Sequence, residues 1–165
     1  MNIAIIGGGP AGLMAAEVAL AGGAQVALYD SMPSVGRKFL LAGKGGLNLT
    51  HSDPSDLFLS RYGERRAQVA PWLAEFGPDA LRTWARGLGI DTYVGSSGRV
   101  FPTDMKAAPL LRAWLRRLRQ DGLTIYVRHR WCGWDEKKAL RFETPQGTAA
   151  VRADAVILAL GGGSW

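Results

Sequence analysis

The clearest pattern of apolar and polar positions lies at the start of the chain. Residues 3–6 form an unbroken apolar run, which is typical of a short buried strand. A glycine-rich turn follows, and the alanine-rich segment 13–20 predicts a helix. A second apolar run predicts a strand at 25–29, which leads into Asp30. This order of strand, turn, helix and strand predicts a βαβ unit with parallel strands.

The apolar spacing becomes helical between residues 53 and 89. Two sets of residues recur at i, i+3, i+4 and i+7 on either side of a break at Gly77-Pro78; they are Val69, Trp72, Leu73 and Phe76, and then Leu81, Trp84, Ala85 and Leu88. This spacing predicts two amphipathic helices whose tryptophans belong to the core. Because Pro71 interrupts the first set, that helix is expected either to begin at Pro71 or to bend there.

A third helix is predicted at 106–120, capped by Pro102–Asp104 and preceded by extended segments at 90–94 and 99–101. One face of this helix is apolar and carries Leu111, Trp114, Leu115 and Leu118. The other face is basic and carries Arg112, Arg116 and Arg119, with Arg117 close by. A solvated face is one interpretation of such a charge run, and a surface for nucleic acid or an acidic partner is the other.

The last third of the chain alternates in the manner of strands. A strand is predicted at 123–127, and it is followed by three more extended runs, at 130–134, 140–144 and 147–152. Polar turns separate these runs, which indicates an antiparallel meander. The apolar segment 155–160 then predicts a buried strand that delivers Gly161–Gly163.

The turn after the first strand has the spacing of a dinucleotide-binding motif. Gly7 would make the tight turn, Gly9 would let the backbone approach a pyrophosphate, and Gly12 would let helix and strand pack closely. The start of the helix that follows this turn would then direct unpaired N–H groups at the phosphates. Asp30 could accept hydrogen bonds from both ribose hydroxyls. A purely structural βαβ corner is the alternative.

Composition and charge indicate which classes of protein the chain can belong to. With 165 residues, 47% of them hydrophobic and 21% charged, the chain is typical of a globular domain. The net charge of +6 makes an anionic partner plausible. A single cysteine, Cys132, forms no internal disulfide, which fits a reducing cytoplasm, and two histidines give a metal site little support. The first strand leaves no room for a signal peptide, and no apolar run is long enough to span a membrane.

The segment 31–52 is rich in glycine and cations, which favours a loop that wraps a ligand over one that packs in a core. Gly43-Lys44 has a superficial likeness to a P-loop. However, the spacing from Gly36 is wrong, and Gly45 stands where a Ser or Thr should bind magnesium. A nucleotide triphosphatase is therefore excluded.

Several of these motifs together resemble one known family. Gly7–Gly12, Asp30 and the run 36–50 are similar to the BaiN-like (YhiN-like) family of NAD(P)/FAD-dependent flavoproteins, whose fold is of the glutathione-reductase type. The segments 98–102 and 156–163 match two further signatures of that family, so the resemblance spans the whole chain. It implies a Rossmann-like α/β FAD-binding domain with an antiparallel meander and a helical insertion.

The resemblance also implies the cofactor and its site. FAD would be the bound dinucleotide, and NAD(P)H the electron donor. Trp131 would meet the adenine where the meander begins, and the glycines at 161 and 162 would make a second close backbone approach. The full set of expected cofactor-binding residues is Gly7, Gly9, Pro10, Ala11, Gly12, Asp30, Ser31, Gly36, Arg37, Lys38, Asn48, Trp131, Gly161 and Gly162.

The chain departs from the family pattern in one place. Many members carry Arg-Cys-Asn where this chain has Gly46-Leu47-Asn48, and an Asn where it has His51. The role of that cysteine is therefore absent, and only Asn48 and Thr50 carry over directly. No catalytic residue is predicted.

Family members continue beyond this point with a substrate domain, so the chain is expected to be the N-terminal fragment of a longer protein. Residues 1–165 would form a single, incomplete FAD-binding domain. Its parts would be the βαβ unit and glycine-rich loop at 1–52, a mostly helical insertion at 53–105, and the helix, strand, meander and final strand at 106–165.

The predicted function is that of a cytoplasmic FAD-dependent oxidoreductase that transfers hydride from NAD(P)H, through flavin, to a carbon-carbon double bond. The resemblance implies two substrate types, a steroid-like enone and a uridine base in ribosomal RNA. The arginine-rich helix slightly favours RNA, with Arg112, Arg116 and Arg119 as the contact. The alternative is a dinucleotide-binding module without turnover. A single-Rossmann dehydrogenase is disfavoured by the meander and by the segment 36–50.

Overall fold

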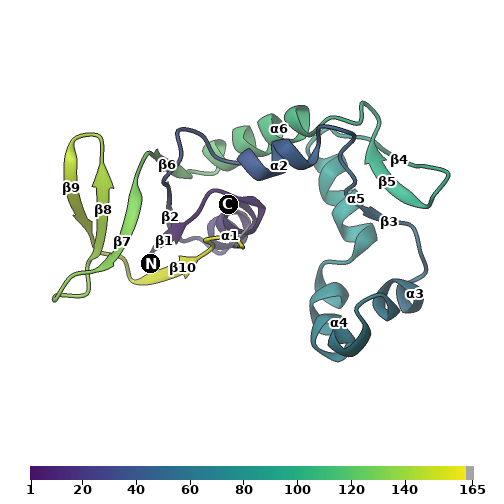
Figure 1. Cartoon of the computed structure of the whole chain (residues 1–165), viewed down its shortest axis with the longest axis horizontal. Helices are drawn as coiled ribbons and strands as arrows, with labels where there is room; N and C mark the ends of the chain where they lie inside the picture. Colours follow the sequence, from purple (N-terminus) through teal and green to yellow (C-terminus); the bar gives the residue numbers. More distant parts are fainter. Residues whose placement is uncertain (163–165) are drawn as a thin grey trace. The chain divides into compact units, whose positions relative to one another are not determined.

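The computed structural model describes residues 1–162, so the expectation for Gly163 lies outside the described residues. Two compact units make up the chain (Figure 1). The first unit contains residues 1–39 and the segment from Leu115 onward, and the second contains Leu40–Trp114.

A four-stranded parallel sheet is the centre of the first unit. Its order is β10-β1-β2-β6, formed by β1 (Asn2–Ile6), β2 (Gln25–Asp30), β6 (Thr124–Val127) and β10 (Ala155–Leu158). All four strands were expected, but the expectation that the last one is buried is wrong. Its residues are half-buried, and Leu158 is 47% exposed, because β10 is an edge strand in the described part of the chain.

Helix α1 (Pro10–Ala21) packs against β1, β2 and β10 and begins earlier than the pattern of alanines suggested. Pro10 can occupy the first turn because its missing N–H would have no partner within the helix there. Gly12, Leu13 and Ala16 form the buried stripe. At the far end, the N–H of Gly22 donates to the carbonyl of Val18 at 3.1 Å and closes the last turn.

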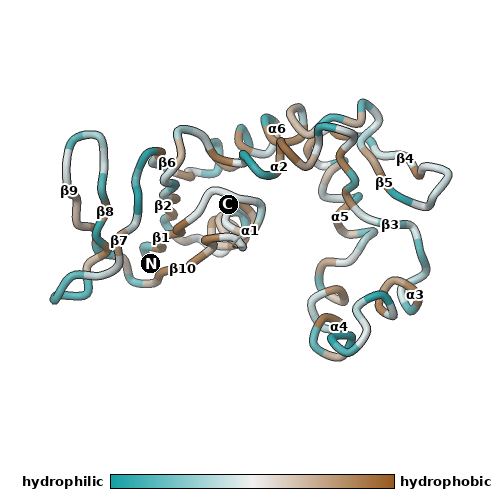
Figure 2. Tube along the Cα trace, viewed as in Figure 1, coloured by the Kyte–Doolittle hydropathy of each residue, from teal (hydrophilic) through white to brown (hydrophobic). Residues whose placement is uncertain are grey.

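The predicted meander is confirmed and packs on the parallel sheet. Strands β7 (Arg130–Trp134), β8 (Leu140–Thr144) and β9 (Gly147–Val151) form a three-stranded antiparallel sheet. The brown segments of Figure 2 include the apolar stretches of β1 and β10. The shared core consists of side chains from β1, β2 and β8, namely Ala4, Ile6, Tyr29, Leu140 and Phe142. Because side chains alternate across a strand, Ile3 and Ile5 face the opposite side of the sheet.

The second unit is mostly helical, as expected. Its helices are α3 (Ser55–Ser60), the 3-10 turn η1 (Gly63–Arg65), α4 (Arg66–Glu75) and α5 (Pro78–Gly87). A small antiparallel sheet, ordered β3-β5-β4, contains β3 (Thr50–His51), β4 (Thr92–Val94) and β5 (Arg99–Pro102). The extended segments expected at 90–94 and 99–101 are therefore confirmed as the hairpin β4–β5.

Three expectations for this part of the chain need correction. The segment 31–52 is not a loop throughout, because it contains α2 (Arg37–Ala42) and β3. Of the two alternatives for Pro71, a helix that begins there is wrong, because Pro71 lies inside α4; a bend at Pro71 stays a prediction. The tryptophans differ in environment: Trp72 is 69% exposed, whereas Trp84 packs edge-on against Trp114, with 4.8 Å between ring centroids.

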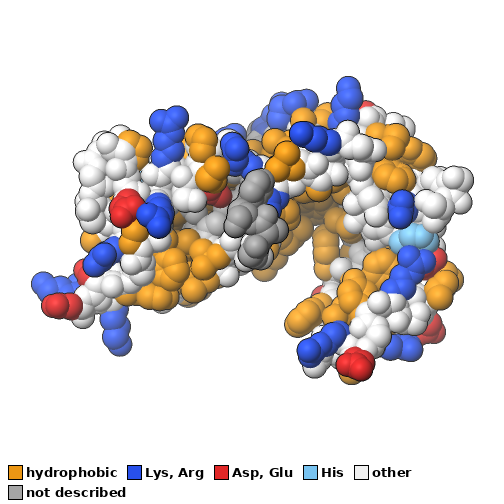
Figure 3. Space-filling model, in the orientation of Figure 1, with side chains coloured by type: hydrophobic (Ala, Val, Ile, Leu, Met, Phe, Trp, Pro, Cys, Tyr) orange, Lys and Arg blue, Asp and Glu red, His pale blue; other side chains and the backbone are white. Residues whose placement is uncertain are grey.

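Helix α6 (Ala107–Gln120) confirms the predicted division into an apolar and a basic face. Leu111, Trp114 and Leu118 are buried, and Arg112, Arg116 and Arg119 are exposed. Arg117 does not belong with these exposed cations, because its guanidinium donates to Glu17 Oε1 on α1 at 2.6 Å. Figure 3 shows basic side chains over α6.

Candidate functional site

A cleft of about 760 Å³ lies in the first unit, at the carboxyl ends of its central parallel strands. This is the edge at which open α/β sheets bind ligands. Residues from the glycine turn, the end of β2, the segment 31–38, the corner before β7 and the loop after β10 line it. Every expected cofactor-binding residue except Gly12 and Asn48 is among them; the ones present are Gly7, Gly9, Pro10, Ala11, Asp30, Ser31, Gly36, Arg37, Lys38, Trp131, Gly161 and Gly162.

The three motif glycines differ in what a side chain would meet. At Gly7, where φ is +111°, a Cβ atom would lie 2.2 Å from the carbonyl oxygen of Ala159. At Gly12 it would lie 1.9 Å from the carbonyl oxygen of Gly7, so this glycine allows close packing of helix on turn. At Gly9 it would meet nothing within 4 Å among residues 1–162. The side of Gly9 is therefore open, which is what a backbone that receives a phosphate requires.

The N-terminus of α1 also opens on this turn. The first intrahelical hydrogen bond runs from Leu13 N to Gly9 O at 2.9 Å, so the N–H groups of Ala11 and Gly12 precede the regular ladder. Within the range that the structure describes, no side chain caps this end of the helix, and the first turn of the helix holds no acidic residue. The partial positive charge of the helix end is therefore available to an anion.

Asp30 is held in place by the backbone of two loops. Its Oδ2 accepts from Gly8 N at 2.7 Å, and its Oδ1 accepts from Met32 N at 2.8 Å. Each carboxylate oxygen can accept a further hydrogen bond. The carboxylate is thus oriented at the edge of the cleft and keeps capacity for two hydroxyl donors.

The segment after Met32 brings cations to the cleft. Val35 is buried, and Gly36 N donates to Gly8 O at 2.8 Å, which joins this segment to the glycine turn. Arg37 and Lys38 follow at once, at the start of α2. The Nζ of Lys38 donates to the carbonyl of Gly162 at 3.3 Å. Two cations therefore lie in the part of the cleft that the helix N-terminus also faces.

Aromatic side chains form the end of the cleft near Asp30. The ring of Tyr29 stacks on Tyr126 (4.9 Å between centroids) and on Phe142 (4.5 Å), and His129 lies 5.9 Å from Tyr29. Burial, and secondarily the neighbouring Tyr126, raises the pKa of Tyr29, so its phenol is neutral across the ordinary pH range.

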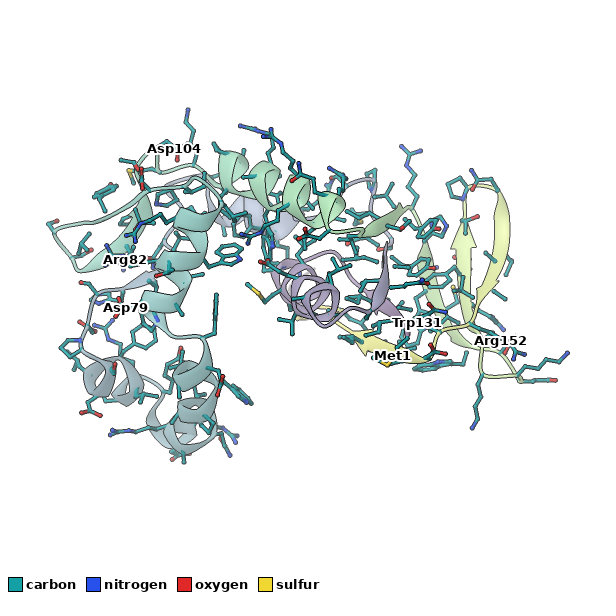
Figure 4. The ribbon with its side chains drawn as sticks, turned by 180° about the vertical axis from the view of Figure 1, so that it is seen from behind. Met1, Asp79, Arg82, Asp104, Trp131 and Arg152 are labelled. Atoms are coloured by element: carbon teal, nitrogen blue, oxygen red, sulfur yellow. The ribbon has the colours of Figure 1, made fainter. Side chains whose placement is uncertain are left out.

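Trp131, on β7 of the meander and labelled in Figure 4, also lines the cleft and packs against the shared core. Its indole Nε1 is buried and has no hydrogen-bond partner in the described part of the chain. The indole ring lies edge-on to Trp134, with 4.7 Å between centroids. Flat apolar walls of this kind suit a planar aromatic ligand.

Asn48 belongs to the second unit, and its role at the cofactor stays a prediction. In the orientation that satisfies its amide, its nitrogen donates to Thr50 O at 2.8 Å and to Val100 O at 3.3 Å. His51, where the chain departs from the family pattern, also has local partners. Its Nε2 lies 2.9 Å from Ser97 O, and its Nδ1 lies 3.0 Å from Asp53 Oδ1. His51 thereby fixes the turn of the β4–β5 hairpin to the start of the α3 segment.

Sequence reasoning did not name several residues that line the cleft. They include Gly8, Tyr29, Met32, Ser34, His129 and Arg130. Gly8 could have been inferred because it lies within the motif, between Gly7 and Gly9; a Cβ atom there would meet Val35 and Asp30. His129 gave no signal, since a single histidine between two strands has no characteristic spacing.

Residues 1–162 contain no group of three or more His, Cys, Asp or Glu side chains that could hold a metal ion. None of the helices in the same range is long and apolar enough to cross a membrane.

Taken together, an open glycine turn, an uncapped helix end, an oriented carboxylate and an aromatic end wall fit a dinucleotide such as FAD.

Comparison with known proteins agrees with this geometry. The chain is 32% identical over 130 residues to a 3-dehydro-bile acid delta(4,6)-reductase of Clostridium scindens, which covers 76% of this chain and 31% of that protein. Its fold is similar to a flavocytochrome c3 fumarate reductase (TM-score 0.71, 19% identity, 98% of this chain and 33% of the other). It is also similar to a 3-ketosteroid-delta4-(5alpha)-dehydrogenase from Rhodococcus jostii RHA1 (TM-score 0.69, 15% identity, 94% and 44%).

The chain thus spans about a third of the length of the curated relative. The family described as HI0933-like protein Rossmann domain matches residues 1–165. This is the BaiN-like (YhiN-like) group that the motifs resemble, and the parallel sheet with its glycine turn is the fold that the family name describes. The chain therefore belongs to the HI0933-like Rossmann-domain family of flavoproteins.

Proposed function

We propose that this chain binds FAD and forms the cofactor-binding part of an oxidoreductase that transfers hydride from NAD(P)H to a carbon-carbon double bond. The flavin, when bound, supplies the redox chemistry, and the protein supplies binding and orientation. The observation that carries this proposal is the cleft that combines the open side of Gly9, the N-terminus of α1 and the carboxylate of Asp30.

Each part of the cleft has a role in this proposal. The turn at Gly9 and the N–H groups that open α1 would receive the pyrophosphate, with Arg37 and Lys38 to offset its charge. Asp30 would hold the adenosine ribose, and its charge would disfavour a 2′-phosphate. The aromatic end wall would then receive the adenine.

A steroid-like enone is the substrate class that the relatives favour. The curated relative is named for the reduction of a 3-dehydro bile acid, and one fold neighbour is named as a ketosteroid dehydrogenase. Both names describe chemistry at a carbon-carbon bond near a ketone on an apolar ring system. We extend that class to the longer protein of which this chain would be the cofactor-binding part.

The test of this proposal begins with the ligand of the purified chain. Heat release followed by mass analysis should give FAD in stoichiometric amount, and NAD alone would refute the proposal. Full-length protein should be yellow and should bleach on addition of NADH or NADPH. A folded protein that binds FAD but is not bleached would favour the alternative, a dinucleotide-binding module without turnover.

Asp30→Ala should weaken FAD binding by about 10- to 100-fold, which corresponds to about 1.5–3 kcal/mol for hydrogen bonds to a charged acceptor. The variant loses the ribose contacts and also the acceptor of Gly8 N. The dissociation constant, measured by fluorescence titration, gives the effect.

Asp154→Ala is the matched control. Asp154 also accepts a backbone N–H, from Asn2 at 2.7 Å, but it does not line the cleft. Its replacement should leave the FAD dissociation constant unchanged. An equal drop in affinity in both variants would show that Asp30 acts only through the fold.

A second candidate substrate is a uridine base in ribosomal RNA. The observation that favours it is the exposure of Arg112, Arg116 and Arg119 along one face of α6. Contacts of these cations with phosphates would make RNA binding fall steeply as salt rises. The alternative is that the three arginines only contact solvent and do not bind RNA.

Replacing these three arginines by glutamine should make RNA binding less dependent on salt. The slope of the logarithm of the binding constant against the logarithm of the salt concentration should fall in magnitude by about one unit for each phosphate that the cations no longer neutralise. FAD content should not change, because the apolar face of α6 is untouched. Filter binding of full-length protein at several salt concentrations measures the slope. A slope equal to that of the wild type would remove the case for RNA binding at this helix.

A further inference from the structure

The corner between β6 and β7 is joined to the segment that follows Asp30. His129 N donates to Asp30 O at 2.9 Å, and Arg128 N donates to Met32 O at 3.0 Å. Strand β6 lies beside β2 on the side away from β1. A dinucleotide with its pyrophosphate at the glycine turn and its ribose at Asp30 therefore places its base between Met32 and this corner.

His129 is one of the residues that line the cleft. Its ring lies 5.3 Å from Tyr126, 5.9 Å from Tyr29 and 6.1 Å from Phe142, so aromatic neighbours hold it from three strands. Its Nδ1 lies 2.8 Å from the carbonyl oxygen of Val127. The ring is therefore located both by packing and by a hydrogen bond.

That hydrogen bond also fixes the tautomer of the neutral ring. A carbonyl oxygen can only accept, so Nδ1 must carry the proton. The Nε2 atom is then left with a lone pair, and it has no hydrogen-bond partner within residues 1–162. His129 thus contributes one oriented acceptor to the residues that line the cleft.

We infer that His129 is a specificity-determining residue, which selects adenine through a hydrogen bond from the 6-amino group of the base to Nε2. This inference rests on the proposed binding of FAD. A purine with a carbonyl oxygen at position 6 would set that oxygen against the lone pair of Nε2. The wall formed by Tyr29 and Trp131 accepts any flat base, so His129 supplies the discrimination.

The test compares FAD with flavin hypoxanthine dinucleotide, which differs at the 6 position of the purine. Isothermal titration of the purified chain should give about tenfold tighter binding of FAD, the value of one net hydrogen bond. Three variants then separate the roles of the two ring nitrogens. His129→Phe keeps the ring packing, His129→Asn keeps a donor for Val127, and His129→Gln places an amide near the position of Nε2.

His129→Phe and His129→Asn should bind both dinucleotides with equal affinity. His129→Gln should also bind both equally but more tightly, because its amide can offer either oxygen or nitrogen. Retained preference for FAD in His129→Phe or His129→Asn would overturn the inference, as would equal binding of the two dinucleotides by the wild type. Failure of the wild type to bind either dinucleotide would instead refute the proposed binding of FAD, and the inference with it.

Discussion

Gly9→Val is expected to abolish FAD retention without unfolding the protein. Gly9 has φ −80° and ψ −178°, an extended conformation that valine adopts without strain. A Cβ atom at this position meets no atom of the described part of the chain within 4 Å, so the side chain fits that part of the fold. It would, however, fill the space where the pyrophosphate must approach the backbone. Flavin absorbance after purification and thermal unfolding measure the two effects separately.

Gly12→Val is the matched control, three residues further along the same motif. Its Cβ atom would lie 1.9 Å from the carbonyl oxygen of Gly7, so helix and turn would have to separate. We expect this variant to lower the free energy of unfolding by about 1–3 kcal/mol or more, as overpacking does. Gly9→Val should change it by less than about 0.5 kcal/mol. FAD retention by Gly9→Val equal to that of the wild type would contradict the assignment of the cleft.

The parts of the site that the sequence predicted are those that local chemistry determines. Three such features occur at a fixed spacing in the sequence. They are the glycine with φ +111° at Gly7, the close packing contact at Gly12 and the carboxylate at the end of β2. The meander was also predictable, because its strands alternate and polar turns separate them. These features can be predicted without knowing which distant residues pack against them.

The incorrect predictions concern which faces of the helices and strands are covered by other parts of the chain. Periodicity placed Trp72 on an apolar face, but periodicity does not say whether another element packs on that face, and Trp72 is 69% exposed. The same limitation applies to β10, whose apolar residues lie at a sheet edge. Arg117 was assigned to a basic surface because its partner, Glu17, lies 100 positions away. His129 was missed for the same reason, since its neighbours come from three separate strands.

The division of residues 1–165 into a single FAD-binding domain with an insertion stays a prediction, as does location in the cytoplasm. The described chain has two compact units with boundaries near residues 39 and 114. The cofactor-binding residues of the cleft all belong to the first unit. The second unit has its own hairpin, its own buried contacts and the departure from the family motif at His51.

Phe142 links the stability of the first unit to its candidate site. Its side chain is fully buried between the meander and the parallel sheet, and its ring stacks on Tyr29 at 4.5 Å. Through Tyr29 and His129 it also supports the end of the cleft that would receive the adenine. A residue that supports both the core and the site should affect both when it is truncated.

Phe142→Ala should therefore lower the free energy of unfolding by about 3–5 kcal/mol, the usual effect of deleting a buried aromatic ring. That is a large share of the roughly 5–15 kcal/mol that stabilises a typical domain. Urea unfolding measures the decrease, and FAD titration below the unfolding transition should show weaker binding because Tyr29 and His129 lose their support. Trp134→Ala, which truncates a 49% exposed ring on the same meander, should cost only about 0.5–1.5 kcal/mol. If the two variants were destabilised equally, the meander would not be packed on the parallel sheet through Phe142, and the end wall of the cleft would lack the support assigned to it.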